Sequence, residues 1–320
     1  MKQKLIVVCG PTASGKTDLA VALAKRFDGE IVSADSMQIY RDVSIATAKP
    51  TSEEMSGIKH HMIDILDLSE EFSVADYVRL ASECISDIAN AGRMPIVCGG
   101  TGLYISSLIN GIRFDETCSS TELRNELSKI AEEKGGEYLL GILREFDPES
   151  AERLHPNNLM RIIRAIEVYK ISGVTMTEAN RISQKESPYD PVMIGLNYSD
   201  RELLYSRINQ RVDRMLEMGL LEEARMVLSR ENVATAGQAI GHKEFKPYFS
   251  GEKSLEECVE SVKQDSRRHA KRQLTWFRRD VRINWIYRDL LSSDENETEV
   301  ASRIIENSGF YKDNERRIHR

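Results

Sequence analysis

GPTASGKT, at residues 10–17, is the stretch of sequence that decides the fold. It matches the pattern GxxxxGK[ST] in full, directly follows the apolar run LIVVC at residues 5–9, and opens a segment with helical spacing. Glycines in such a loop let backbone N–H groups curl around an anion at a helix N-terminus. A chance glycine turn would not bring strand, helix and Lys-Thr pair into register. The sequence therefore predicts a diphosphate-binding loop formed by Gly10, Pro11, Thr12, Ala13, Ser14, Gly15, Lys16 and Thr17.

Two side chains of this loop carry the expected chemistry. Lys16 would neutralise phosphate oxygens, and the hydroxyl of Thr17 would hold Mg²⁺, which we predict as the cofactor. A loop of this kind suits ATP and any diphosphate ester equally well. The loop alone therefore leaves the identity of the ligand open.

The order of apolar runs predicts an α/β fold. Residues 5–9, 30–34 and 94–98 read as strands, and the segments 18–27 and 74–89 between them read as helices. This alternation is typical of a parallel sheet flanked by helices, here a P-loop NTPase-like sheet. Each strand ends in a small or polar turn.

The amino-acid composition changes after Gly111. Residues 121–170 are rich in Glu, Lys, Arg and Leu, and Gly135-Gly136 and His155-Pro156 break them into helices, so we predict an inserted all-helical domain. An apolar stretch at 192–196 returns to the sheet. The predicted organisation is a catalytic core at 1–112 and 192–290, a helical insertion at 113–191, and a polar, partly disordered tail at 291–320.

Polar and small residues follow the second and third predicted strands. Asp35 ends the second strand and places a carboxylate at the edge of the sheet where open α/β sheets bind ligands. A purely structural role, in which Asp35 caps the following turn, is the alternative. The third strand ends in the turn Gly99-Gly100-Thr101-Gly102, which is either a second anion contact or a plain turn.

A predicted helix at 201–218 adds three cations. Arg207, Arg211 and Arg214 recur on one side, and at roughly 100° per residue Arg211 lies nearest the apolar stripe. We therefore expect Arg211 to turn inward. Arg207 and Arg214 suit a solvated basic face.

Composition excludes several classes of protein. Apolar runs are far shorter than a membrane span and the N-terminal stretch lacks a cleavage site, so we expect no membrane partner and no export. Neither a zinc site nor a disulfide framework is indicated, and a reducing cytoplasm fits, because no CxxC pair occurs among Cys9, Cys84, Cys98, Cys118 and Cys258.

Charge is concentrated in one segment. The chain has a net charge of −7, but residues 263–282 (KQDSRRHAKRQLTWFRRDVR) carry +6, which leaves −13 for the rest. Indiscriminate coating of nucleic acid is therefore not expected, since it rests on phosphate neutralisation. The segment is either one local phosphate-binding face or a solvated helix whose arginines pair with the acidic body.

Six ordered blocks together resemble one family, the bacterial tRNA dimethylallyltransferases. The resemblance runs from about Lys4 to Tyr287 and includes a helical insertion and a basic segment near the C-terminus. The blocks are GPTASGKT at 10–17, DSMQIY at 35–40, ATAKP at 46–50, GGTGLY at 99–104, RIIRAIEVYKISG at 161–173 and KRQLTWFR at 271–278.

The resemblance implies an activity and a set of roles. A dimethylallyl group would pass from dimethylallyl diphosphate to the N6 amine of the adenosine immediately 3′ of the anticodon. Asp35 would accept the amine proton, Thr101 would hydrogen-bond near the reacting groups, and Arg211 would join Lys16, Thr17 and Mg²⁺ on the departing diphosphate.

The same resemblance implies a tRNA-binding set, with the anticodon stem-loop as partner. We expect the protein to be a monomer. Asp35, Thr101 and the residues after Asp35 would hold an everted adenine, while basic residues grip the stem-loop phosphates. The implied tRNA-binding residues are Asp35, Ser36, Met37, Gln38, Thr101, Arg124, Arg161, Arg164, Lys271, Arg272 and Arg278.

Two positions depart from the family pattern. His242 stands where relatives often carry an aromatic Tyr, which puts a stacking role there in doubt, and Met160 stands where Gln often precedes the Arg. The chain also lacks the C-terminal zinc finger of eukaryotic relatives.

Three alternative functions fit parts of the sequence. A small-molecule kinase shares the loop and the carboxylate but leaves residues 263–282 unexplained. A prenyltransferase acting on free adenine nucleotides shares the core chemistry but needs no stem-loop clamp. A non-enzymatic nucleotide switch would have no use for Asp35 as a base.

Overall fold

The structure of the chain, a computed structural model, describes residues 2–112, 120–183, 187–231, 233 and 235–309. The described residues form two compact units, one within the ranges 1–109 and 188–320 and the other within 110–187. Within the described ranges, no helix combines the length and the apolar character needed to span a membrane.

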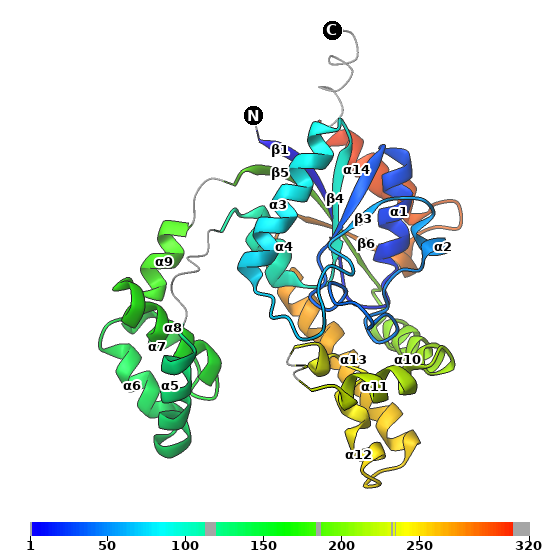
Figure 1. The fold of residues 1–320 in the computed structure, drawn as a ribbon. Helices are drawn as coiled ribbons and strands as arrows, with labels where there is room; N and C mark the ends of the chain where they lie inside the picture. Colours follow the sequence, from blue (N-terminus) through cyan, green and yellow to red (C-terminus); the bar gives the residue numbers. More distant parts are fainter. Residues whose placement is uncertain (1, 113–119, 184–186, 232, 234, 310–320) are drawn as a thin grey trace. The chain divides into compact units, whose positions relative to one another are not determined.

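A six-stranded parallel sheet forms the centre of the larger unit, in the order β3-β2-β4-β1-β5-β6. The sheet confirms the predicted α/β class, and its carboxyl edge carries the loops after β1, β2 and β4 (Figure 1). The strands are β1 Gln3–Cys9, β2 Gly29–Ser33, β3 His60–His61, β4 Met94–Gly99, β5 Tyr189–Asn197 and β6 Ile283–Tyr287. Of these, β3 and β6 are absent from the sequence prediction.

Helices cover both faces of this sheet, because successive side chains of a strand point to opposite faces. Leu5 and Val7 of β1 pack with α3 (Val74–Asn90) and α4 (Gly102–Ile109). Ile6 packs on the other side with α1 (Lys16–Arg26). Figure 1 shows α1 and α3 on opposite sides of the sheet. The core is therefore a three-layer sandwich, and it holds the start of α1 rigidly at the sheet edge.

Beyond the carboxyl edge of the sheet stand the helices α10 Arg201–Glu217, α11 Leu220–Ser229, α12 Lys246–Phe249 and α13 Leu255–Phe277 (Figure 1). Leu204 and Ile208 of one helix pack against Ala270 of another, which fixes the pair that borders the loop after β1. The short elements of this unit are α2 Ser52–Met55 and the 3₁₀ turns η1 Ala236–Gln238, η2 Lys243–Phe245 and η3 Arg288–Leu290.

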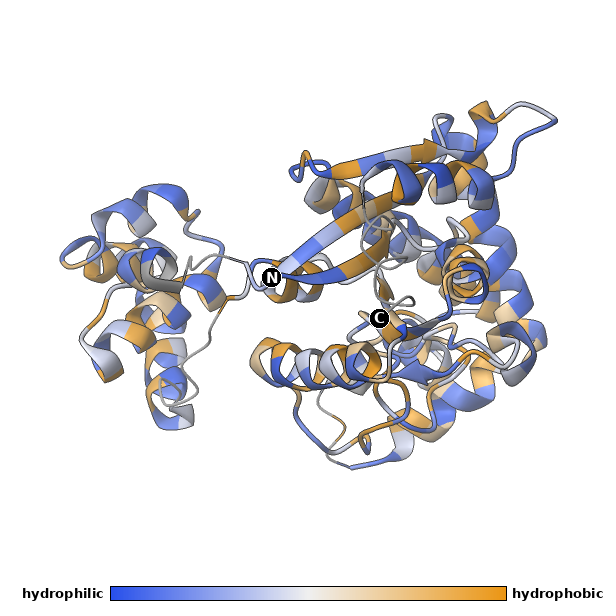
Figure 2. Ribbon diagram, turned by 90° about the horizontal axis from the view of Figure 1, so that it is seen from above, coloured by the Kyte–Doolittle hydropathy of each residue, from blue (hydrophilic) through white to orange (hydrophobic). Residues whose placement is uncertain are grey.

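The smaller unit consists of helices around its own core, with both expected breaks in place. Gly135 separates the first two helices, and the third ends at Arg153, before the His155-Pro156 break. Figure 2 shows hydrophobic and hydrophilic residues on these same helices, as expected for helices with one buried face. The helices are α5 Thr121–Lys134, α6 Gly136–Arg144, α7 Pro148–Arg153, α8 Leu159–Ser172 and α9 Met176–Ser183.

The prediction of a polar, partly disordered tail at 291–320 is wrong for part of this range. Residues Glu297–Asn307 form the helix α14, and Ala301 and Ile305 are fully buried against α1 and the sheet. The four-residue spacing of these apolar side chains places them on one helix face, a signal that the polar average of the segment hides. Residues 310–320 lie outside the described part of the chain.

Candidate functional site

The loop between β1 and α1 has the backbone of an anion site. Gly15 adopts φ 90° as the N-cap of α1 and supplies no side-chain cap, so the first N–H groups of the helix are left for a ligand. A Cβ at Gly10 would lie 2.4 Å from the carbonyl oxygen of Leu196. Both glycines are therefore required by the conformation that the sequence motif predicts.

Two half-buried cations adjoin the loop. Burial lowers the pKa of Lys16, and the nearby Arg211 acts in the same direction. Burial also lowers the pKa of Arg211, whose Nη1 donates to Thr12 Oγ1 at 3.1 Å. Each charge would be stabilised by an anion placed between them. The prediction that Arg211 turns inward is confirmed, while Arg207 and Arg214 are exposed.

Asp35 performs the capping role and remains open on its other side. Its Oδ1 accepts hydrogen bonds from the N–H groups of Met37 at 2.9 Å and Gln38 at 3.4 Å. Its Oδ2 has no hydrogen bond with any residue that the structure describes. One oxygen thus holds the turn, and the other is available to accept a proton.

Thr101 and Gln38 join the loops around Asp35. Thr101 Oγ1 accepts from the N–H of Ser36 at 3.1 Å, which ties the end of β4 to the end of β2. Gln38 Nε2 donates to the carbonyl oxygens of Thr47 and Ala48, both at 3.3 Å. Since its Oε1 also accepts from Ser33, the amide of Gln38 is already engaged within the protein, and its contact with RNA stays a prediction.

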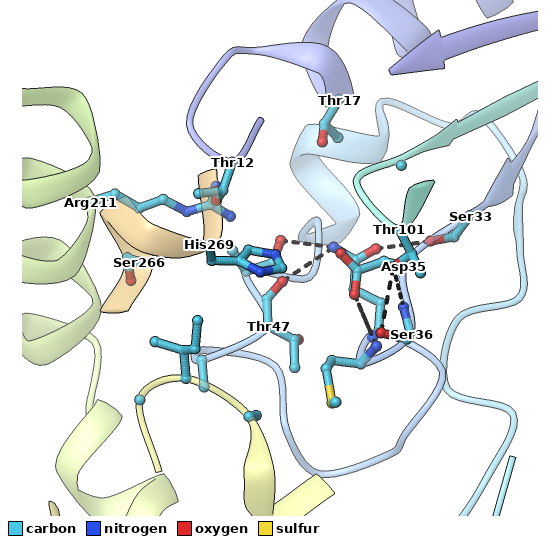
Figure 3. Close-up of a pocket in the computed structure, with 18 of the residues that line it drawn as sticks. Thr12, Thr17, Ser33, Asp35, Ser36, Thr47, Thr101, Arg211, Ser266 and His269 are labelled. Atoms are coloured by element: carbon cyan, nitrogen blue, oxygen red, sulfur yellow. Dashed lines mark hydrogen bonds between the residues drawn. The ribbon is translucent and has the colours of Figure 1, made fainter. Parts of the chain in front are cut away.

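These groups share one cavity of about 320 Å³. Figure 3 shows Arg211, His269 and Asp35 converging on it from three different elements. The predicted site residues that line the cavity are Thr12, Lys16, Thr17, Asp35, Ser36, Met37, Gln38, Thr101, Arg211 and Arg272. The arrangement can hold a diphosphate at one end and a group that loses a proton to Asp35 at the other.

Two further residues of this cavity escaped the sequence analysis. Gln273 is buried; its Oε1 accepts from the N–H of Thr12 at 2.8 Å and its Nε2 donates to the carbonyl oxygen of Gly100 at 3.0 Å. Burial lowers the pKa of His269, so this histidine is neutral near pH 7. Helical spacing could have identified Gln273, because it recurs with Ala270 and Phe277 on the buried face of α13. No signal distinguished His269 within a basic run.

Gln273→Ala is expected to lower the free energy of unfolding by about 1 to 3 kcal/mol, because the N–H of Thr12 and the carbonyl of Gly100 both lose their buried partner. It should also weaken binding of inorganic diphosphate, since the loop loses its tether to α13. Denaturant unfolding and calorimetric titration measure the two effects. Gln210→Ala is the matched control, because Gln210 is exposed and bonds to Ser206 of its own helix. Equal free energies of unfolding and equal diphosphate affinities in the two variants would contradict the role of Gln273 as a tether of the loop.

The basic segment is half paired. Lys263, Arg267, Arg268 and Arg282 form ion pairs with Asp213, Glu260, Asp265 and Asp280, respectively. Within the described part of the chain, no ion pair forms on the other four cations, which are all exposed: Lys271, Arg272, Arg278 and Arg279. The paired-helix alternative therefore accounts for only half of the segment.

In the smaller unit, two predicted tRNA contacts share a buried carboxylate. Arg124 Nε and Arg164 Nη1 lie 2.9 Å and 2.7 Å from the two oxygens of Glu167, which is fully buried. Their guanidinium groups are thereby held at the surface, with side chains 45% and 38% exposed. Arg161 is also exposed. Contact of these three residues with RNA stays a prediction.

His242, the departure from the family pattern, has a structural partner. It is fully buried, and its Nε2 lies 3.0 Å from Glu223 Oε1. Glu223 also accepts from the N–H groups of Ile45 and Ala46 at 2.8 Å and 2.9 Å. The histidine therefore supports the loop at 45–48, and its neighbours Gly241 and Lys243 line the cavity in its place.

Comparisons with known proteins give one consistent result. Residues 38–280 match the family described as IPP transferase. A tRNA dimethylallyltransferase of Caldanaerobacter subterraneus subsp. tengcongensis is 50% identical over 90% of this chain and 93% of its own, and one of Acetivibrio thermocellus is 48% identical over 96% of both chains.

Solved structures agree with the sequence comparisons. The tRNA isopentenylpyrophosphate transferase of Bacillus halodurans aligns over 100% of both chains with a TM-score of 0.72 and 41% identity. A eukaryotic dimethylallyltransferase acting on tRNA aligns over 97% of this chain and 80% of its own, with a TM-score of 0.82 and 31% identity.

Proposed function

Because this chain belongs to the IPP transferase family, we propose that it transfers a dimethylallyl group from dimethylallyl diphosphate to an adenosine of tRNA and releases diphosphate. The acceptor is the N6 amine of the adenosine immediately 3′ of the anticodon. The observation that carries the proposal is the single cavity in which Asp35 faces the phosphate-binding loop, Lys16 and Arg211.

The chemistry follows from this arrangement. The adenine nitrogen attacks the first carbon of the allylic chain, a C–N bond forms, and the bond from that carbon to the diphosphate oxygen breaks. Asp35 Oδ2 accepts the amine proton, while its Oδ1 stays bonded to the N–H of Met37. Lys16, Arg211 and the N–H groups at the start of α1 stabilise the charge that develops on the leaving diphosphate.

Magnesium fits this site through Thr17. The Thr17 side chain lines the cavity at the first turn of α1, and hydroxyl oxygen is a ligand that Mg²⁺ accepts. Among the described residues no cluster of three or more His, Cys, Asp or Glu is placed to hold a metal, so substrate oxygens and water would complete the coordination. Bound Mg²⁺ would neutralise part of the diphosphate charge.

The exposed cations of α13 and of the turn that follows it favour tRNA over a free nucleotide as acceptor. Neutralising Arg272, Arg278 and Arg279 together to Gln should raise the KM for tRNA strongly and leave the KM for dimethylallyl diphosphate almost unchanged. Contacts to phosphates release counterions, so each contact removed should lower the salt dependence of stem-loop binding by roughly one unit of slope. Stem-loop affinity across a salt series measures the effect.

The control for this triple variant is Lys263, Arg267 and Arg268 changed together to Gln. It removes the same charge from the same basic segment, but from residues that are already ion-paired. The salt dependence of stem-loop binding by this control should stay close to that of the unmodified protein. If both triple variants lower the slope equally, or neither does, the basic segment does not grip RNA, and prenylation of free AMP becomes the alternative to test.

A further inference from the structure

Two arginines lie behind the phosphate-binding loop, outside the cavity. Arg207 Nε, from α10, donates to the carbonyl oxygen of Ala13 at 3.2 Å. Arg288 Nη1, directly after β6, donates to the carbonyl oxygen of Ser14 at 3.2 Å. Neither residue is among those that line the cavity. Both residues contact the backbone of the loop that borders the cavity.

Arg288 is fixed on several sides. Its Nη2 donates to Glu297 Oε1, the two atoms lying 2.6 Å apart, and both side chains are less than one quarter exposed. Its guanidinium carbon lies 5.9 Å from the centre of the Tyr198 ring, and that of Arg207 lies 5.5 Å from the same ring. A planar guanidinium held by a carboxylate and a ring presents its remaining N–H groups in one direction.

The bond to Ser14 determines where the next N–H points. A trans peptide is planar, so the carbonyl of Ser14 and the N–H of Gly15 point in opposite directions. With the carbonyl held outward by Arg288, the N–H of Gly15 is turned toward the side of the anion. The bond also polarises the peptide, which strengthens that N–H as a donor.

The loop carries backbone strain beside this contact. Ala13 has φ 62°, an unfavourable conformation for a residue with a side chain. A Cβ at Gly15 would lie 2.3 Å from Arg288 Nη1. Gly15 is favoured by its own φ of 90°, and any side chain at this position would displace the guanidinium of Arg288 from the loop.

We propose that Arg288, braced by Glu297 of α14, is a positioning residue for diphosphate: it fixes the Ser14–Gly15 peptide so that the loop N–H groups face the leaving group. The inference rests on the proposed function for its meaning in catalysis. It assigns the helix α14 a role in the active site, although none of this helix's residues lines the cavity.

The test compares Arg288→Ala, Arg288→Lys and Glu297→Gln with Arg303→Ala. Arg303 of α14 is exposed and pairs with Glu295, so its variant removes an ion pair of the same helix without touching the loop. The measurements are the affinity for inorganic diphosphate by calorimetry, the separate KM values for dimethylallyl diphosphate and tRNA, and thermal unfolding. Titrations are carried out well below the lowest melting temperature.

Arg288→Ala is expected to weaken diphosphate binding and raise the KM for dimethylallyl diphosphate by about tenfold, the effect of one hydrogen bond to a charged group, with the KM for tRNA unchanged. Arg288→Lys should recover only part of this, because one ammonium cannot serve Ser14 and Glu297 with fixed geometry. Glu297→Gln should give a smaller loss in the same direction, and Arg303→Ala none.

Unchanged diphosphate affinity in Arg288→Ala would overturn the inference, as would equal rises in both KM values or full rescue by lysine. Since diphosphate binding is measured without prenyl transfer, this outcome is distinct from failure of the proposed function, which would show as absence of transfer by the unmodified protein.

Discussion

Replacing Asp35 by asparagine is expected to abolish dimethylallyl transfer, a loss of at least about a hundredfold, as for removal of a positioned general base. The change is nearly isosteric. The new amide would keep an oxygen that accepts from the N–H groups of Met37 and Gln38, so the turn should survive. Only the proton acceptor is lost.

Affinity for dimethylallyl diphosphate should change by less than about tenfold in this variant, because the carboxylate acts on the amine. Single-turnover transfer and equilibrium binding separate the two quantities. Asp42→Asn is the control, since Asp42 lies on the same connection but forms an exposed ion pair with Arg230. Full transfer by the Asp35 variant would remove this residue from the mechanism.

Lys16→Ala and Arg211→Ala are both expected to slow prenyl transfer strongly. Each should cost about 2 to 4 kcal/mol of transition-state stabilisation, as expected for a half-buried charge facing a leaving anion. Burial lowers the pKa of both groups, which indicates charges held in a poorly solvated site where a new anion interacts strongly. The measured quantity is kcat/KM for transfer.

Arg214→Ala is the matched control for Arg211, since Arg214 lies three residues further along α10 and is exposed. It should retain nearly full kcat/KM. If Lys16→Ala and Arg211→Ala left prenyl transfer intact and instead abolished an ATP hydrolysis or phosphoryl-transfer activity, the kinase alternative would replace the present assignment.

The phosphate site was predictable because its parts are contiguous in sequence. GPTASGKT encodes the loop, its anion-facing N–H groups and Lys16 in eight residues, and Asp35 follows the neighbouring strand. Sheet edges bring such strand ends together without further information. The fold class and the family resemblance are also confirmed. Both predictions rest on short blocks of sequence in a fixed order.

The contacts that hold the site in shape were not predictable, because their partners are far apart in the chain. Gln273 reaches Gly100 across 173 residues, and Arg288 reaches Ser14 across 274. Local periodicity in the sequence does not predict hydrogen bonds between residues so far apart. The helix α14 was missed for a different reason: its average polarity concealed the four-residue spacing of Ala301 and Ile305.

The predicted tRNA contacts divide along similar lines. The family resemblance implies all of these contacts. Residues 36–38 also follow Asp35 directly in sequence, whereas Arg124, Arg161 and Arg164 belong to a separate compact unit whose interactions with RNA no local pattern specifies. The pairing of Arg124 and Arg164 with Glu167 shows how such side chains are held, and their RNA contacts stay predictions.

Prenyl transfer to tRNA is tested by incubating the protein with dimethylallyl diphosphate, Mg²⁺ and either unmodified tRNA or free AMP, and analysing the nucleosides by mass spectrometry. We expect dimethylallyl adenosine next to the anticodon, one diphosphate released for each group transferred, and little or no product from AMP. Absence of prenylated tRNA, or efficient prenylation of AMP with none of tRNA, would contradict the proposed function.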